Sequence, residues 1–289
     1  MRPARFAYRD PSTLDGVLAE LREWGDEASV LAGGQSLIPL LNMRLARPEV
    51  VIDLQRVPGL DGVDVDGPVR LGTAVRARTV EHDPAIAARL PVLVEAIRHV
   101  AHPQIRNRTT IGGSLAHADP SSELPGVLAA LDGHVELASD RGSRTVPWDR
   151  FFAGPFTTTR EPDELLTSAT FPVPSDLRLR FLEFARRRGE YPIAGVCVGV
   201  RSEAGLIADA RLAAIGVGPG PMRLYAAEQV LVGAMADDQE ARVSAAATAR
   251  AEVDPSDDIH GSAAFRRGMV AILIRRALDG LAEGAEHGG

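Results

Sequence analysis

The chain has 289 residues, of which 45% are hydrophobic and 25% are charged, a composition typical of a soluble globular protein that buries its own core. Its formal net charge of −7 and its pI near 5.6 argue against a basic, nucleic-acid-binding surface. No apolar run approaches the roughly 20 residues needed to cross a bilayer, so we expect no transmembrane segment.

The first 175 residues alternate short apolar runs with helical patterns. Ser12 is expected to cap a helix whose apolar face contains Leu14, Val17, Leu18 and Leu21. The elements expected after it are a strand at 28–32, a helical turn at 36–45, strands at 50–54 and 69–73, one long helix at 84–100, a helix at 123–131, strands at 135–137 and 145–146, and a closing strand at 164–171.

After a proline-containing linker at 172–176 the pattern changes. Three apolar runs, at 181–186, 194–200 and 207–217, predict strands of an antiparallel sheet. Two alanine-rich helices are expected to follow, at 239–252 and 262–281. Strands followed by helices are the order of an α+β domain.

A pair of glycines ends the first expected strand, in the segment Ala32-Gly33-Gly34-Gln35-Ser36. Glycine lets the backbone turn tightly and approach a ligand without a Cβ in the way. Successive N–H groups before a helix form a concavity suited to a pyrophosphate. The alternative is a strand-to-helix turn that binds nothing, since Gly-Gly pairs are common in turns.

A second glycine pair lies in the segment Thr110-Ile111-Gly112-Gly113-Ser114. Two such loops in one domain are able to clamp the two phosphates of a dinucleotide. Neither loop has the G-x-G-x-x-G pattern of a Rossmann fold, and the chain lacks the Gly-Lys-Ser or Gly-Lys-Thr of a P-loop. A nucleotide site here therefore requires another architecture.

The chain has a single cysteine, Cys197, in an apolar stretch that predicts a buried, inert thiol. An iron–sulfur cluster usually takes about four cysteine ligands, so an electron carrier in this chain has to be organic. His99 and His102 are expected on one helix face, but no third ligand is spaced for a metal. Residues 1–10 lack the apolar run of a signal peptide, and we expect a protein of the reducing cytoplasm.

Two long segments resemble the flavin loops of the CO dehydrogenase medium-subunit family, the flavoproteins of the xanthine dehydrogenase type. They are AGGQSLIPLLNMRLARPEVVIDL at 32–54 and HPQIRNRTTIGGSLAHADPSSELP at 102–125, and the similarity continues through GPFTTTREPDELL at 154–166 and beyond. The resemblance implies an α+β fold. Residues 1–175 would form an FAD-binding domain of the vanillyl-alcohol-oxidase/PCMH type, in subdomains of about 1–55 and 56–175. Residues 176–289 would form a CO-dehydrogenase-flavoprotein C-terminal domain, with a three-stranded antiparallel sheet plus helices.

The resemblance also implies a set of FAD contacts. Both glycine segments would wrap the pyrophosphate through backbone amides and hydroxyls. Glu123 falls where the family has an acidic residue that binds ribityl or ribose hydroxyls, and Asp119 would assist it or stabilise its own turn. Leu166 would pack near the flavin ring. The segment 186–191, with Arg187 and Tyr191, matches the stretch that approaches the isoalloxazine from the second domain.

The sequence departs from the family pattern at two places. Thr109 stands where many relatives have glycine, so the turn before the second loop is expected to be less tight. Glu190-Tyr191-Pro192 replaces a Gly-Asp-Phe-Ala type of sequence. Tyr191 is therefore the candidate for a ring that faces the flavin, and a half-buried tyrosine with a hydrated hydroxyl is the alternative.

The resemblance implies an FAD-binding, electron-transfer subunit of a molybdenum hydroxylase. In this family a molybdenum cofactor in a large subunit oxidises the substrate, and electrons reach FAD through [2Fe–2S] clusters of a small subunit. The implied assembly is a dimer of heterotrimers, and no catalytic residue or metal ligand is assigned to this chain. A self-sufficient FAD-dependent oxidoreductase and a flavin-free assembly or binding protein of the same fold remain alternatives.

Overall fold

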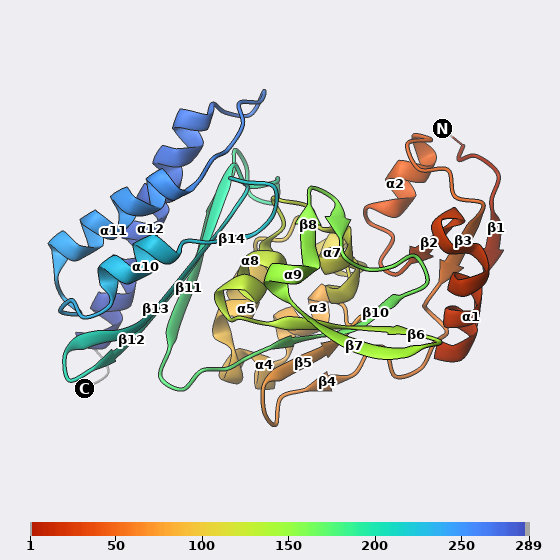
Figure 1. Cartoon of the computed structure of the whole chain (residues 1–289), viewed down its shortest axis with the longest axis horizontal. Coiled ribbons are helices and arrows are strands. Elements are labelled where there is room, and N and C mark those ends of the chain that lie inside the picture. The colour runs from red at the N-terminus through yellow and green to blue at the C-terminus, as the bar shows by residue number, and fades with distance from the viewer. Residues whose placement is uncertain (1, 287–289) are drawn as a thin grey trace.

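The N-terminal part of the chain folds as a small parallel sheet with crossover helices (Figure 1). The computed structural model describes residues 2–286. The strands lie in the order β1-β3-β2 and are β1 (Ala7–Arg9), β2 (Ala28–Leu31) and β3 (Val50–Asp53). Parallel neighbours cannot be joined by a tight hairpin, so the connections contain the helices α1 (Leu14–Trp24) and α2 (Leu37–Asn42).

Helix α1 has a different cap from the one predicted. The hydroxyl of Thr13, not that of Ser12, accepts a hydrogen bond from the N–H of Gly16 at 3.1 Å. The predicted apolar face is otherwise confirmed, because Val17 and Leu21 are buried in the core around β3. Backbone geometry selected one of two adjacent hydroxyl residues.

The middle of the chain forms a five-stranded antiparallel sheet in the order β4-β5-β10-β6-β7. The strands are β4 (Val63–Asp64), β5 (Val69–Gly72), β6 (His134–Ser139), β7 (Gly142–Pro147) and β10 (Leu165–Phe171). A short helix, α9 (Trp148–Phe151), leads to a small hairpin of β8 (Phe152–Gly154) and β9 (Thr157–Thr158). All four strands predicted for this region are present.

The single helix predicted over 84–100 is wrong. Two shorter helices, α4 (Pro84–Arg89) and α5 (Pro91–Ile97), occupy this stretch. Leu90 between them has φ −143° and ψ 70°, because a residue before proline avoids the helical region. His99 and His102 therefore share no helix face, since His102 precedes the separate helix α6 (Pro103–Arg106).

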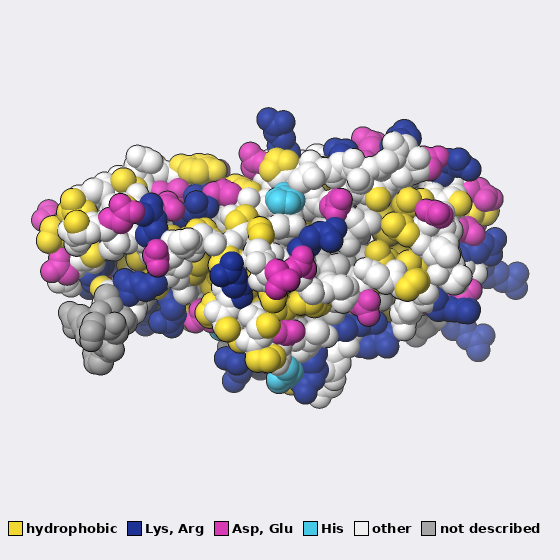
Figure 2. Space-filling model, turned by 90° about the horizontal axis from the view of Figure 1, so that it is seen from below, with side chains coloured by type: hydrophobic (Ala, Val, Ile, Leu, Met, Phe, Trp, Pro, Cys, Tyr) yellow, Lys and Arg dark blue, Asp and Glu magenta, His cyan; other side chains and the backbone are white. Residues whose placement is uncertain are grey.

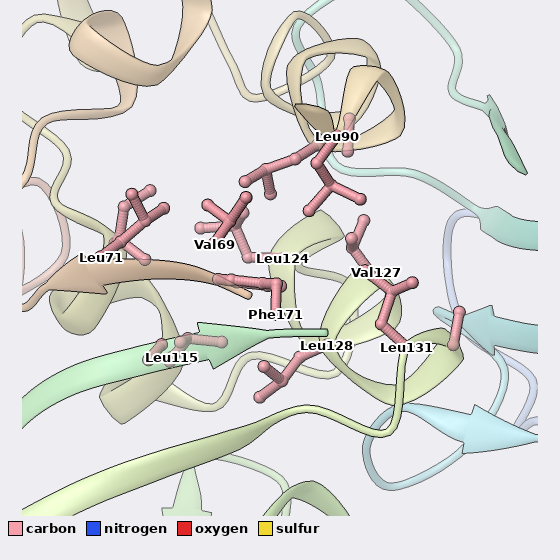
Figure 3. Packing of buried hydrophobic residues seen from close by; sticks show 14 of the residues in the cluster. Val69, Leu71, Leu90, Leu115, Leu124, Val127, Leu128, Leu131 and Phe171 are labelled. Atoms are coloured by element: carbon pink, nitrogen blue, oxygen red, sulfur yellow. The ribbon is translucent and has the colours of Figure 1, made fainter. Parts of the chain in front are cut away.

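One hydrophobic core joins the middle sheet to its helices, among them α3 (Ala77–His82), α5 and α8 (Glu123–Ala130) (Figure 3). Phe171 of β10 and Val69 of β5 are paired neighbours and share this core with Leu124 and Leu128 of α8. Every residue of α8 is buried, as expected for a helix enclosed on all sides. Because α8 also packs against the third sheet, it joins the two halves of the molecule.

The C-terminal part contains an antiparallel sheet of four strands, β11-β12-β13-β14, where three were predicted. The strands are β11 (Arg178–Phe184), β12 (Ala194–Glu203), β13 (Leu206–Ile215) and β14 (Met222–Arg223). The strand β14 was missed because its two residues are too few to show an alternating pattern. Three helices cover one face of this sheet (Figure 1): α10 (Tyr225–Leu231), α11 (Gln239–Glu252) and α12 (Ala263–Glu286). Of these, α10 was not predicted.

An ionic cluster around the buried guanidinium of Arg223 connects the sheet to α8. Nη1 of Arg223 donates to a carboxylate oxygen of Asp132 at 2.7 Å and to the carbonyl of Ala129 at 3.1 Å. Its Nε donates to Glu228 at 2.7 Å, and Glu228 also accepts from the N–H of Leu212. Each charge in the cluster has hydrogen-bonded partners, which compensates the cost of burial.

Charged side chains on the surface are mixed in sign. Figure 2 shows basic and acidic side chains interspersed over the face in view, without a continuous basic patch. Among residues 2–286, no helix is long and apolar enough to span a membrane.

Candidate functional site

A cavity of about 940 Å³ is lined by residues from the N-terminal, middle and C-terminal parts of the chain. Ligand pockets commonly have volumes of 300–1,000 Å³. Most of its walls come from five stretches of the chain, 28–40, 100–123, 160–166, 186–193 and 258–266, and Leu54 and Thr73 complete them. Both glycine segments lie in this wall, so the structure brings together the two loops that the sequence singled out.

The first glycine segment presents unused backbone donors to the cavity. Gly34 has φ +76°, a conformation that favours glycine. Within the described residues, the N–H groups from 33 to 36 donate no hydrogen bond. The side-chain nitrogen Nε2 of Gln35 donates to the carbonyl of Gly33 at 3.2 Å, which holds the turn. Successive free N–H groups of this kind form an anion-binding concavity.

The two glycine segments lie against each other. A Cβ on Gly33 would overlap the carbonyl oxygen of Arg108 and lie 3.0 Å from Cα of Thr109. A Cβ on Gly113 would lie 3.5 Å from Cβ of Ala32. Glycine is needed at position 33 because the two backbones approach closely there. The sequence alone could not show this reason for glycine.

The second segment differs from the prediction, because it begins a helix, α7 (Ile111–His117). Its amides are used internally: Ile111 donates to Val75, Gly112 to Thr73, Ser114 to the carbonyl of Thr110, and Gly113 to the Thr110 hydroxyl. These amides already have partners within the protein, so a role for this segment in binding a pyrophosphate stays a prediction that rests on its hydroxyls. The Ser114 hydroxyl, 3.0 Å from that of Ser122, remains at the wall, whereas Ile111 lies wholly in the core.

Glu123 is the buried carboxyl of the cavity. It opens helix α8, is 7% exposed, and makes no hydrogen bond through its side chain to any other described residue. Burial, followed by the negative charge of Glu183, raises its pKa to about 8. Asp119 also lines the cavity, and its carboxylate accepts from the N–H of Ser121 at 2.9 Å, so it does stabilise its own turn.

The remaining predicted residues lie in two places. Leu166 is buried and lines the cavity, and Tyr191 lines it while remaining 71% exposed, more than the half-buried alternative allowed. Arg187 does not line the cavity: its side chain is 85% exposed and pairs with Glu190 at 3.6 Å. The neighbouring Arg186 lines the cavity in its place.

Sequence reasoning missed the contribution of the loop before α12. Arg266 is buried and donates to the carbonyls of Ile193 at 2.6 Å and Gly216 at 3.0 Å, and to Asp258 at 2.5 Å. These bonds fix Asp258 and His260 against the cavity. No sequence signal indicated this, because arginine in a helical pattern is ordinary. Arg160, in the loop before β10, also lines the cavity and was not singled out.

Two further features concern metal ligands and the single thiol. Among the described residues, no group of histidine, cysteine and carboxylate side chains is placed to hold a metal ion. Cys197 is buried in β12, and burial raises the pKa of its thiol well above the ordinary value, so the thiol is inert as predicted.

This geometry defines a class of protein. An α+β scaffold whose first glycine turn offers free N–H groups beside a buried carboxyl is suited to a dinucleotide cofactor, which carries a pyrophosphate and sugar hydroxyls. The absence of a Rossmann or P-loop pattern already required such a different architecture.

Comparison with known proteins then identifies the family. Residues 4–174 match the family described as "FAD binding domain in molybdopterin dehydrogenase", and residues 180–281 match the "CO dehydrogenase flavoprotein C-terminal domain". The chain belongs to this family of FAD-binding oxidoreductase subunits, as the resemblance implied. FAD is its cofactor, and the molybdenum and iron–sulfur cofactors lie in other subunits.

Similar proteins cover the whole chain. The nicotine 6-hydroxylase medium subunit of Paenarthrobacter nicotinovorans is 41% identical over 96% of this chain and 98% of its own length. The carbon monoxide dehydrogenase medium chain of Hydrogenophaga pseudoflava is 35% identical over 96% and 98%. A chain in the structure of quinoline 2-oxidoreductase from Pseudomonas putida 86 superposes with a TM-score of 0.94 at 34% identity, covering 99% of this chain and all of that chain. The fold predicted from the resemblance is thereby confirmed.

Replacing Glu123 with glutamine is expected to flatten the pH dependence of stability in the flavin-free protein. Its pKa is raised from 4.5 to about 8, so between these values the folded chain holds a proton that the unfolded chain has lost. Stability therefore falls as pH rises through this window, by at most about 1.4 kcal/mol per pH unit. Urea unfolding at pH 5, 6, 7 and 8 measures the slope, and equal slopes for wild type and E123Q would contradict the assignment.

Proposed function

We propose that this chain holds FAD in the cavity and passes electrons, received from [2Fe–2S] clusters of a partner subunit, on to a terminal acceptor. The observation that carries the proposal is the pairing of free N–H groups at 33–36 with the buried carboxyl of Glu123 in one cavity. When bound, FAD supplies the ability to accept electrons singly and to release them singly or in pairs.

The residues present fit this cofactor. The N–H groups of the first glycine segment, Gly33 to Ser36, would bind the pyrophosphate, and the Ser114 and Thr110 side chains border it. Glu123 would accept hydrogen bonds from ribityl or ribose hydroxyls. Leu166 supplies an apolar wall beside the cavity, and the exposed ring of Tyr191 stands at the second domain's side. We propose that the flavin ring lies between these two side chains.

We propose a molybdenum-cofactor large subunit and a [2Fe–2S] small subunit as partners, arranged as a dimer of heterotrimers in the cytoplasm. The names of relatives support the first part: several are called medium subunits or medium chains, and one is a subunit of a dehydrogenase complex. We further propose that the two functional domains meet at residues 175 and 176, in the linker between β10 and β11.

The purified chain is expected to contain close to one FAD per polypeptide. The free N–H groups and Glu123 form a site for one dinucleotide, and the cavity volume of about 940 Å³ leaves no space for a second. An absorption spectrum before and after denaturation, with the released cofactor identified by chromatography, gives the stoichiometry. A colourless protein that cannot be reconstituted with FAD would favour the flavin-free assembly protein.

The self-sufficient oxidoreductase is separated from the subunit by a second measurement. If FAD is bound but the isolated chain does not reduce an acceptor with any of a panel of N-heterocycles and aldehydes, the subunit role is supported. Sustained turnover by the isolated, fully loaded chain would contradict it.

A further inference from the structure

We propose that binding of the flavin's hydroxyl groups to Glu123 expels a proton, and that Glu183 and His99 conduct this proton to the surface. The inference rests on the proposed function, because it assigns the flavin to this cavity. It concerns two side chains that do not line the cavity. Their role would be to adjust the charge of Glu123, which does line the cavity.

Glu183 is a buried carboxylate with an unused oxygen. It lies in β11, and its side chain is 4% exposed. Its Oε1 is 3.2 Å from Nδ1 of His99, while its Oε2 is buried without any hydrogen-bond partner. An unpaired buried carboxylate oxygen is costly, so Oε2 is open to a further hydrogen-bond donor.

His99 connects this carboxyl to solvent. Its side chain is 35% exposed, and its ring packs against Phe181 with centroids 5.6 Å apart. Glu183 lies close enough to Glu123 for its charge to raise the Glu123 pKa. The three side chains thus form a series from the cavity wall, through a buried carboxyl, to a partly exposed imidazole.

The surroundings of Glu123 favour its protonated form in the empty cavity. Within residues 2–286 no cation forms an ion pair with it, and the cations on the packed elements have partners of their own, Arg180 with Glu95 and Arg223 with Asp132 and Glu228. The other titratable groups that line the cavity are Asp119, His117, Arg160, Glu164, Arg186, Glu190, Tyr191, Asp258, His260 and Arg266. Of these, Arg266 is paired with Asp258, and Glu164 with Arg144.

Flavin binding makes the ionised form of Glu123 the favoured one. Hydroxyl groups donate hydrogen bonds, and an ionised carboxylate accepts them more strongly than a protonated one. The O–H bond of the Glu123 carboxyl breaks, and its proton passes to the Glu183 carboxylate, then to the His99 imidazole and to buffer. One proton is released for each protonated Glu123 that becomes ionised, and no electron is transferred.

Calorimetry of oxidised FAD binding to the flavin-free chain tests this directly. Titrations at pH 7 in phosphate and in Tris, which differ in ionisation enthalpy, give the number of protons released. With a Glu123 pKa of about 8, we expect about 0.9 proton per FAD, and an affinity that rises up to about tenfold per pH unit from pH 6 to 8. E123Q should release close to none, and E240Q, an exposed glutamate of α11, should behave as wild type.

Two further variants test the path. E183Q removes the charge that disfavours ionisation, so proton release at pH 7 should fall and the pH dependence should move to lower pH. H99Q should leave the number of protons unchanged but slow their appearance relative to binding. Stopped-flow recording with a pH indicator alongside flavin fluorescence measures this delay, and H99Q keeps the test available if E183Q does not fold.

The outcomes separate this inference from the proposed function. FAD binding by wild type without proton release would overturn the inference and leave the function standing. Equal release and rates in wild type, E183Q and H99Q would remove the path while keeping Glu123 as the source. Failure of wild type to bind FAD would overturn the proposed function itself.

Discussion

Replacing Arg106 with alanine is expected to lower the free energy of unfolding by about 3–5 kcal/mol, the typical cost of removing one partner from a buried ion pair. Arg106 is 7% exposed and bonds to both carboxylate oxygens of Glu81, at 2.9 and 3.1 Å. Its Nη1 also donates to the carbonyls of Val100 and Ala101, each at 3.0 Å. The variant would leave the Glu81 carboxylate and both carbonyls without this donor.

The same substitution is expected to weaken flavin binding, because Arg106 holds the stretch that precedes Thr110 and helix α7. Urea unfolding measures the stability, and FAD titration measures the affinity. Arg187→Ala is the matched control, since its side chain is 85% exposed and its pairing with Glu190 is long, at 3.6 Å; exposed pairs contribute about 0–1 kcal/mol. Equal unfolding free energies for the two variants would show that the Arg106 pair does not stabilise this region.

Replacing Gly33 with alanine is expected to weaken FAD binding by about 10–100-fold. A Cβ at this position would overlap the carbonyl oxygen of Arg108 and approach Cα of Thr109 to 3.0 Å. Overpacking of this kind typically costs about 1–3 kcal/mol. Because the neighbouring atoms are backbone, the first glycine segment would have to move away from the second, and its free N–H groups would lose their alignment.

Fluorescence titration of FAD against the G33A variant measures this loss. Gly67→Ala is the control, because a Cβ there meets nothing within 4 Å and the position needs no positive φ. Thermal unfolding of both flavin-free variants separates misfolding from local displacement. Wild-type affinity in G33A would show that contact between the two segments does not shape the site.

Both substitutions act on one structural arrangement. The first glycine segment belongs to the N-terminal parallel sheet, whereas Arg106 and Thr110 belong to the middle of the chain. The cavity exists because these separate parts approach closely enough for their backbones to touch, and the loop anchored by Arg266 encloses it from the C-terminal side. We therefore expect FAD to stabilise the arrangement of the three parts by binding only the folded chain.

The sequence by itself determined most of the strands and the cofactor class. Apolar runs located the strands of the first two sheets except the short β1 and β4, and the two glycine pairs marked both walls of the cavity. The long motifs at 32–54 and 102–125 carried the resemblance to the family. The proline at 91 could have located the break between α4 and α5, but the apolar periodicity on either side favoured one long helix.

Only the tertiary structure decided which atoms of these motifs are free to bind a ligand. The second glycine segment has a loop-like sequence, yet its amides are used within α7 and by Thr73 and Val75. Contacts such as Arg266 with Ile193, or Glu183 with His99, join residues far apart in the chain. Local patterns report which side chains are apolar, whereas such contacts depend on how separate segments pack, because packing alone sets which buried groups meet and which remain unpaired.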